Sequence, residues 1–327
     1  MIVAGDIGGT HARIGLFEVR NGTATLVTER KYPSREFTGL EVVVRTFLEE
    51  VKADPTCAAF GLAGPVRDGR VRTPNLPWEV DSRVLASELG LEQVSLINDL
   101  EALAYGIPSL EPADLVVLNP GVDSEGNRAV VAAGTGLGVA GLIWDGQRHR
   151  PFATETGHTD FAPRNALEAE LMLHLSKRFG RVSNERILSG AGLTNVYDFL
   201  QQSGRGEEPA WLSERLARED RAKVISLCGL DQSSSLCSQA LDVFASVYGA
   251  VAGNVALVFL ATGGVYLGGG VAPKVLARLQ DPRLFRAAFV DKGRLSRVME
   301  QVPVRVVLDD RVGMRGAAQV ALQELPR

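Results

Sequence analysis

One short pattern occurs twice in this chain: a strand, a loop of glycine and threonine, a second strand and a tight turn. In the first copy, Ile2–Gly5 leads into Gly8-Gly9-Thr10, Ala12–Val19 alternates apolar with polar or small residues, and Asn21-Gly22 follows. Asn-Gly between two strand-like runs is a strong hairpin signal. Residues 2–27 are therefore predicted to form a three-stranded antiparallel meander whose first turn is the glycine loop.

The second copy begins at Arg128. Its predicted parts are a strand over Arg128–Ala133, a glycine loop over Gly134–Gly138, a strand over Val139–Trp144 and a turn at Asp145-Gly146. By analogy of fold, two such halves indicate an α/β protein with the duplicated ribonuclease-H-like (actin-like ATPase) fold, whose two domains border a cleft. We expect a small α/β domain formed by residues 1–108 and 303–327, and a large α/β domain formed by residues 109–302.

Helical spacing of apolar residues predicts a helix over Leu40–Val51. The spacing of Thr38 and Glu41 is that of a capping box at its start. Further predicted elements are strands at Ala58–Leu62 and Val94–Ile97 and a helix beginning with Leu100–Tyr105.

Composition excludes several classes of function. The 35 Lys and Arg residues do not exceed the 39 Asp and Glu residues, so we expect no nucleic-acid partner. The start of the chain lacks the regions of a signal peptide. Cys57, Cys228 and Cys237 are odd in number and show no metal-ligand spacing, which favours reduced thiols in the cytoplasm.

One apolar stretch, Val243–Leu260, is long enough to suggest a membrane span. It is rich in small residues, contains Asn254, and has no flanking cluster of Lys or Arg. We favour a helix buried inside the protein and expect no membrane partner.

The glycine loops are candidate phosphate sites, because polyphosphate needs backbone N–H groups that can approach closely. Three loops qualify, and Asp6 precedes the first at a position suited to Mg²⁺, directly or through water. Their residues are Gly8, Gly9 and Thr10; Gly134, Thr135, Gly136 and Gly138; and Gly268, Gly269 and Gly270. Each loop taken alone is equally compatible with an ordinary turn. Gly136–Gly141 also matches a dinucleotide fingerprint, but a predicted strand follows it where that fingerprint requires a helix.

Asp99 follows a predicted strand and precedes a helix, where ligand crevices open in α/β sheets. It is a candidate base for phosphoryl transfer to an alcohol. The alternative is that Asp99 only caps the helix. Glu155, His158 and Glu185 are candidates for hydrogen bonds to a sugar, although a single histidine is more often structural.

Many segments of the chain, in order, are similar to those of the bacterial glucokinase family along nearly the whole length. They are Gly5–Arg13, Thr73–Trp78, Ile97–Leu100, Gly134–Ala140, Glu155–Pro163, Asn184–Gly190, Leu267–Pro273, Phe285–Arg294 and Asp310–Gly316. The resemblance implies an ATP-dependent glucokinase that uses Mg²⁺ and forms a homodimer. It implies that Asp99 is the base at the C6 hydroxyl of glucose, that the first two loops bind the ATP phosphates and that Gly268–Gly270 lies near the adenosine. The glucose contacts that it implies are Asn75, Asn98, Asp99, Glu155, His158 and Glu185.

Two residues depart from the family pattern: His11 stands in place of the usual Asn, and Thr156 in place of Gly. Thr156 adds bulk beside the sugar, so a kinase for mannose, fructose or an amino sugar stays an alternative. The related ROK group has a cysteine-rich zinc motif after its Glu-x-Gly-His segment, and no cysteine stands there in this chain, so we expect no zinc. A sugar-sensing regulator with weak turnover is a further alternative, and an actin-like filament former has no support.

Overall fold

The structure, a computed structural model, describes residues 1–74 and 76–325. The chain forms two compact units. Unit 1 comprises Met1–Pro112, Arg150–Ala153 and the chain from Asp309 on, and unit 2 comprises Ala113–His149 and Thr154–Leu308.

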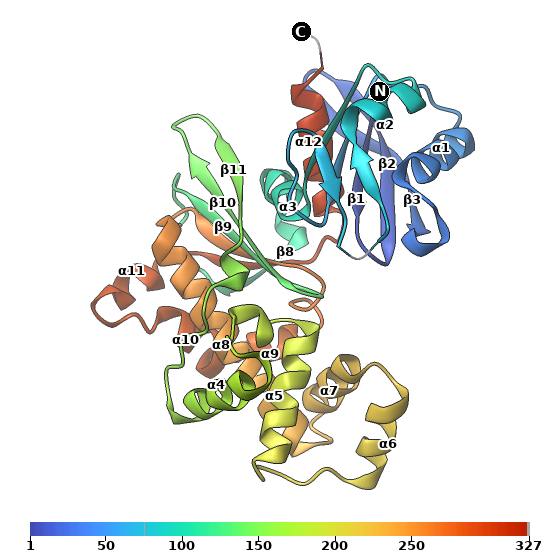
Figure 1. The fold of residues 1–327 in the computed structure, drawn as a ribbon. Coiled ribbons are helices and arrows are strands. Elements are labelled where there is room, and N and C mark those ends of the chain that lie inside the picture. The colour runs from blue at the N-terminus through green and yellow to red at the C-terminus, as the bar shows by residue number, and fades with distance from the viewer. Residues whose placement is uncertain (75, 326–327) are drawn as a thin grey trace. The chain divides into compact units, whose positions relative to one another are not determined.

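The sheet of unit 1 has five strands in the order β3-β2-β1-β4-β7 (Figure 1). Strands β1, β2 and β3 are antiparallel, as the sequence predicts, whereas β1, β4 and β7 are parallel. The strands are β1 Ile2–Ile7, β2 His11–Arg20, β3 Thr23–Pro33, β4 Cys57–Leu62 and β7 Gln93–Asn98, with a separate hairpin of β5 Arg70–Arg72 and β6 Glu79–Asp81. The helices are η1 Ser34–Glu36, α1 Leu40–Val51, α2 Ser82–Leu89, α3 Asp99–Gly106, η2 Ile107–Ser109 and α12 Val312–Gln323.

Helices cover both faces of this sheet, α1 and α2 on one side and α3 and α12 on the other (Figure 1). Because side chains alternate along a strand, Val3 and Ile7 of β1 join the core under α1, and Ile2 and Ala4 join the core under α12. Asp6 continues the second series and therefore belongs to the α12 face.

The start of α1 differs from the prediction. Its N-cap is Gly39 and no side chain caps it, so the predicted capping box of Thr38 and Glu41 is wrong. The chain enters the helix one residue later, because Gly39 takes the extended conformation of an N-cap.

The sheet of unit 2 has the order β11-β10-β9-β12-β13-β8. Strands β9 and β10 are antiparallel, β9, β12 and β13 are parallel, and β8 pairs antiparallel with β13. A hairpin followed by two parallel strands therefore occurs in both sheets, which confirms the duplication predicted from the sequence. The strands are β8 Leu115–Asn119, β9 Arg128–Ala133, β10 Leu137–Trp144, β11 His149–Thr154, β12 Gly264–Gly268 and β13 Val304–Val307.

The remaining elements of unit 2 are helical. They are η3 Pro112–Asp114, η4 Thr156–His158, α4 Ala166–Phe179, η5 Asn184–Arg186, α5 Gly190–Gln202, α6 Ala210–Arg218, α7 Arg221–Leu230, α8 Ser235–Phe259, α9 Leu276–Leu279, the π-helical turn η6 Pro282–Arg286, α10 Ala287–Val290, η7 Gly293–Leu295 and α11 Ser296–Glu300.

Helix α8 contains the apolar stretch except for Leu260, which is the C-cap of the helix. Within the described residues it is the one helix long and apolar enough to cross a membrane, and 67% of its most apolar window is buried inside the protein. A Cβ at Gly249 would overlap the backbone of Phe285, and one at Gly253 would crowd Phe289, so these glycines let η6 and α10 pack closely on the helix. The prediction of a buried helix is confirmed.

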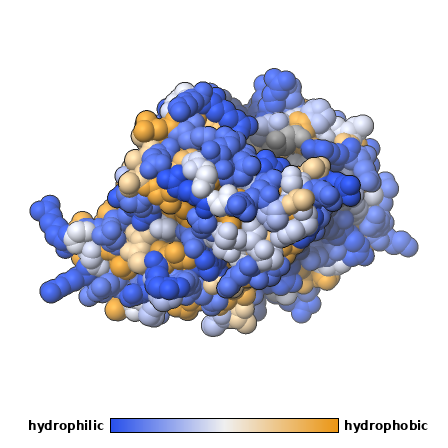
Figure 2. Space-filling model, turned by 90° about the horizontal axis from the view of Figure 1, so that it is seen from below, coloured by the Kyte–Doolittle hydropathy of each residue, from blue (hydrophilic) through white to orange (hydrophobic). Residues whose placement is uncertain are grey.

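On the face of the molecule seen in Figure 2, hydrophobic residues form scattered patches among hydrophilic ones.

Candidate active site

The carboxyl ends of three parallel strands meet at one edge of the first sheet. The register aligns Ile7 of β1, Leu62 of β4 and Asn98 of β7. The loops that follow these strands therefore begin side by side, and Asn98 links two of them by donating from Nδ2 to the carbonyl oxygen of Gly64 at 3.1 Å. This edge holds both the first glycine loop and Asp99.

Asn98, not Asp99, is the N-cap of α3. Its Oδ1 accepts a hydrogen bond from the N–H of Leu100 at 3.0 Å, and its own N–H donates to the carboxylate of Glu101. This reciprocal arrangement is a capping box. Burial raises the pKa of Glu101, and the hydrogen bond from Asn98 opposes that shift. Asp99 is the first residue of the helix, half-buried, and its Oδ1 also accepts from the N–H of Leu100 at 2.9 Å.

Glycines bring α3 close to its neighbours. A Cβ at Gly61 in β4 would lie 2.7 Å from the Cβ of Ala102 in α3. A Cβ at Gly316 in α12 would overlap the carbonyl oxygen of Ala102, and one at Gly106 in α3 would overlap the carbonyl oxygen of Val312. The position of Asp99 therefore depends on close backbone contacts made by residues that were not singled out in the sequence.

The first glycine loop is closed by backbone and by a buried serine. The N–H of Gly8 donates to the carbonyl oxygen of His11 at 3.0 Å, so the side chain of His11 takes no part in closing the turn. Ser34 donates from its N–H to the carbonyl oxygen of Thr10 at 3.0 Å and from Oγ to that of Gly8 at 2.8 Å. Ser34 lies 26 residues from Gly8, and no local pattern marks its role.

Asp6 stands at the base of this loop, partly buried. Its carboxylate accepts no hydrogen bond and makes no ion pair within the part of the chain that the structure describes. A Cβ at Gly313, in the first turn of α12, would lie 2.9 Å from its Oδ2. Burial raises the pKa of Asp6 to about 7; the negative charges of Asp99 and Asp310 act in the same direction, and Arg13 opposes them. Asp6 is thus a carboxylate with an unbalanced charge.

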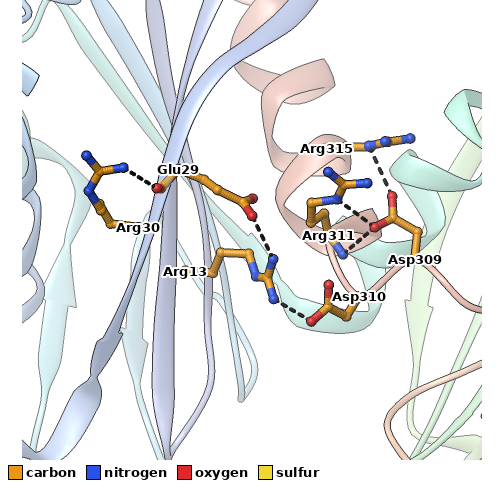
Figure 3. A network of polar contacts seen from close by, with 7 residues as sticks. All are labelled: Arg13, Glu29, Arg30, Asp309, Asp310, Arg311 and Arg315. Atoms are coloured by element: carbon orange, nitrogen blue, oxygen red, sulfur yellow. Dashed lines mark hydrogen bonds and ion pairs between the residues drawn. The ribbon is translucent and has the colours of Figure 1, made fainter.

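Arg13 is the centre of an ion-pair network in this unit (Figure 3). Its guanidinium donates to Glu29 of β3 at 3.2 Å and to Asp310, which precedes α12. On the same segment, Asp309 is buried and pairs with Arg311 at 2.8 Å and Arg315 at 3.2 Å. These contacts fix the C-terminal segment of the chain beside the strand that carries Arg13.

The second glycine loop stands at the corresponding edge of the second sheet. The N–H of Gly134 donates to the carbonyl oxygen of Gly136 at 2.8 Å, and that of Gly190, which opens α5, donates to the carbonyl oxygen of Gly134 at 3.0 Å. A Cβ at Gly134 would meet nothing within 4 Å, so the packing of the chain does not require glycine there. The predicted loop is too long: Leu137 already pairs with Ala133, so β10 begins there and Gly138 lies inside the strand.

The third glycine run is next to the second loop. Gly268 is the last residue of β12, and Gly269 has a φ of +78° that favours glycine. A Cβ at Gly269 would also overlap the backbone of Ala133, at the end of β9, whereas one at Gly270 would meet nothing within 4 Å. Two glycine loops and the start of α5 thus share one edge of the sheet in unit 2.

The three polar candidates of unit 2 lie around η4 and η5. Nε2 of His158 is 3.8 Å from Oε2 of Glu155, and both side chains are exposed, at 54% and 78%. Glu185 accepts a hydrogen bond from the N–H of Leu137 at 3.0 Å, and a Cβ at Gly136 would lie 2.5 Å from its Oε2. Glu185 therefore touches the second glycine loop directly.

Thr156 is held by its neighbours. Its hydroxyl is hydrogen-bonded to that of Thr154 at 2.9 Å, and Thr154 donates to the carbonyl oxygen of Val139 at 2.8 Å. The two short helices are joined by Asn184, which donates from Nδ2 to the hydroxyl of Thr159 at 3.0 Å. Asn75, also predicted to contact the sugar, lies outside the described residues.

Asp6 fits a magnesium site in which the protein supplies only one or two ligands. The described part of the chain contains no group of three or more His, Cys, Asp or Glu residues arranged to hold a metal ion. Mg²⁺ does not need one, because it is usually bound by one or two carboxylates together with waters and substrate phosphates. An unpartnered carboxylate beside a glycine loop, with its pKa raised by burial and by two other acids, is a donor of this kind.

Comparison with known proteins points to one family. The sequence profile described as Glucokinase matches residues 3–324. A glucokinase of Synechocystis sp. is 40% identical over 347 aligned positions that cover 98% of both chains. The crystal structure of a glucokinase from an Antarctic psychrotroph is 30% identical, with a TM-score of 0.86 over 99% of both chains. A ROK family glucokinase from Streptomyces griseus, in complex with glucose and AMPPNP, shares the fold at 21% identity, with a TM-score of 0.65 over 98% of this chain and 99% of that one.

Proposed function

We propose that this chain, which belongs to the glucokinase family, transfers the γ-phosphoryl group of ATP to the C6 hydroxyl of D-glucose, with Asp99 as the general base. The observation that carries this proposal is the edge of the first sheet, where Asp99 follows β7 and the Gly8–Thr10 loop follows β1, the strand that carries Asp6. The influence of Asp99 on the pKa of Asp6 further supports their proximity. A base and a phosphate loop at one edge are what phosphoryl transfer to an alcohol requires.

In the proposed reaction, Asp99 accepts the proton of the C6 hydroxyl of glucose while the C6 oxygen forms a bond to the γ-phosphorus of ATP. The bond from that phosphorus to the β,γ-bridging oxygen breaks, and ADP leaves. The capping box of Asn98 and Glu101 sets the direction of the first turn of α3, so it orients Asp99. Geometry of this kind matters because the protein contributes mainly position and charge to such a transfer.

Residues of unit 2 are proposed to bind the remaining parts of ATP and of glucose. The open space beside Gly134 and Gly270 supports phosphate and adenosine binding, since backbone there is accessible to a ligand. The exposed Glu155 and His158 have the hydrogen-bonding capacity that a sugar needs. Glu185, which touches the second loop, is proposed to hold the sugar and the loop in a fixed relation.

Asp6 is proposed to hold Mg²⁺, directly or through water. When bound there, Mg²⁺ would neutralise charge on the nucleotide phosphates. The residues of the chain set up this role: Gly313 leaves room for the carboxylate, and Ser34 holds the loop that follows it.

A coupled assay of purified protein tests the function directly. ATP would be offered with glucose, mannose, fructose and N-acetylglucosamine in turn, and the highest kcat/KM is expected for glucose. A clearly higher value for another hexose would reassign the substrate and leave the reaction class intact. Binding of glucose without turnover would instead support the regulator.

Asp6→Asn is expected to raise the Mg²⁺ concentration needed for half-maximal activity by about tenfold at pH 8. The pKa of Asp6 near 7 also gives a sign for the pH dependence. Below pH 7 the proton competes with the metal, so the Mg²⁺ requirement of the wild type should rise by up to about tenfold per pH unit. The variant has no such proton to lose. Its Mg²⁺ requirement should be nearly constant from pH 8 to pH 6, and a pH dependence as steep as that of the wild type would reject the metal role of Asp6.

A further inference from the structure

Asp6 and Arg13 are direct partners across two antiparallel strands. The register pairs Asp6 of β1 with Arg13 of β2. Residues opposite each other in such a pair project from the same face of the sheet, with Cβ atoms about 5 Å apart. An arginine in this position has the reach to form an ion pair with the aspartate. That ion pair would occupy the carboxylate proposed to hold the metal.

The ion pair does not form. The guanidinium of Arg13 pairs with Glu29 and with Asp310 (Figure 3). Among the described residues it has no contact of ion-pairing length with Asp6. The side chain of Arg13 is only 14% exposed, so its direction is fixed by these partners and not by solvent. Arg13 influences Asp6 only at longer range, where it lowers a pKa that burial raises.

The two competing carboxylates come from different parts of the chain. Glu29 of β3 is opposite Gly15, two residues beyond Arg13 along β2, and therefore lies on the same face of the sheet as Arg13. Its Oε2 is buried without a hydrogen-bond partner in the described structure, which leaves Arg13 as the nearest charge to balance it. Asp310 is 71% exposed and approaches from the segment before α12.

We propose that Glu29 and Asp310 are positioning residues that hold the guanidinium of Arg13 away from Asp6, so that the Asp6 carboxylate stays open to a divalent cation. The inference rests on the metal role proposed above for Asp6. It assigns a function to an ion-pair network that the proposed chemistry does not otherwise use. It also explains why a buried arginine can be the strand partner of a metal-binding aspartate without blocking it.

The test compares nucleotide binding with and without metal, measured by titration calorimetry. The quantity is the ratio of the dissociation constant of ADP in EDTA to that in excess Mg²⁺, at pH 8. In Glu29→Gln/Asp310→Asn the released Arg13 should pair with Asp6, and the ratio should fall by about tenfold. In the triple variant that also carries Arg13→Met, the competitor is gone, and the ratio should return to within about twofold of the wild type.

Recovery on removal of a third side chain separates the proposal from a merely structural role, because a damaged site would not recover. A double variant with the wild-type ratio, or a triple variant as weak as the double, would overturn the proposal. If the double variant does not fold, Asp310→Asn alone, at an exposed position, should lower the ratio by about threefold and recover with Arg13→Met. If Asp310→Asn does not lower the ratio, or if Arg13→Met does not restore it, the proposal is likewise overturned.

Asp6→Asn distinguishes this inference from its premise. A wild-type ratio in Asp6→Asn would reject the metal role of Asp6, and the inference with it. A reduced ratio in Asp6→Asn together with an unchanged ratio in Glu29→Gln/Asp310→Asn would leave the metal role intact and reject only the part played by Glu29 and Asp310.

Discussion

Asp99→Asn is expected to lower kcat for glucose phosphorylation by at least about 10²-fold and to change glucose affinity by less than about tenfold. The amide keeps the size of the side chain, and its oxygen can still accept the hydrogen bond from the N–H of Leu100. It has lost the ability to take up the proton of the C6 hydroxyl at neutral pH. The loss should therefore appear in kcat, with KM much less affected, in a coupled assay.

Glu101→Gln is the matched control, because it makes the same carboxylate-to-amide change two residues along the same helix. Glutamine can still accept the hydrogen bond of the capping box from Asn98, so kcat should stay within a few-fold of the wild type. Near-normal turnover in Asp99→Asn would reject Asp99 as the base. Equal losses in the two variants would indicate that the helix, and not the carboxylate of Asp99, is what matters.

Gly316→Ala is expected to lower the free energy of unfolding by about 3 kcal/mol or more. The new Cβ would overlap the carbonyl oxygen of Ala102, so α12 and α3 would have to separate. A change of this size should lower the melting temperature by at least about 5 °C in calorimetry. Because α3 begins at Asp99, kcat should fall as well.

Gly190→Ala provides the contrast for stability. Gly190 also stands in a helix, at the start of α5, but a Cβ there would make only ordinary contacts of 3.8 and 3.9 Å. Alanine favours the helix by up to about 1 kcal/mol relative to glycine, so this variant should melt at the wild-type temperature or slightly above it. Similar destabilisation in both variants would show that the close approach of α3 and α12 is not the cause.

The sequence predicted the elements around the candidate base best where a local pattern coincided with a strand end. Asp99 could be located before the structure was known, because an apolar strand ends at Asn98 and a helix follows. The same pattern left open whether Asp99 was a cap. The structure shows that Asn98 is the N-cap, because its side chain accepts a hydrogen bond from the N–H of Leu100. The same side chain donates to the carbonyl oxygen of Gly64 on the neighbouring loop, a contact that no local pattern predicts.

Local pattern was less reliable at element boundaries. The capping box at Thr38 was predicted from spacing alone, and the chain enters α1 at Gly39 instead. The second glycine loop was predicted two residues too long, because glycine content does not reveal that Leu137 already pairs with Ala133. The first error arises because the extended backbone of Gly39 starts the helix one residue later, and the second because the loop ends where β10 begins to pair with β9.

The recurring pattern of strand, glycine loop, strand and turn is what the sequence determined by itself, together with the strands and helices that follow it. These elements depend on side-chain alternation and turn residues, which are local properties of a chain. Tertiary structure alone decided how Asp6 is surrounded. Gly313 and Asp310 lie about three hundred residues away in the sequence, and Ser34 and Glu29 belong to other parts of the unit. Their contacts depend on which strands and helices become neighbours, and no spacing within a short segment encodes that choice.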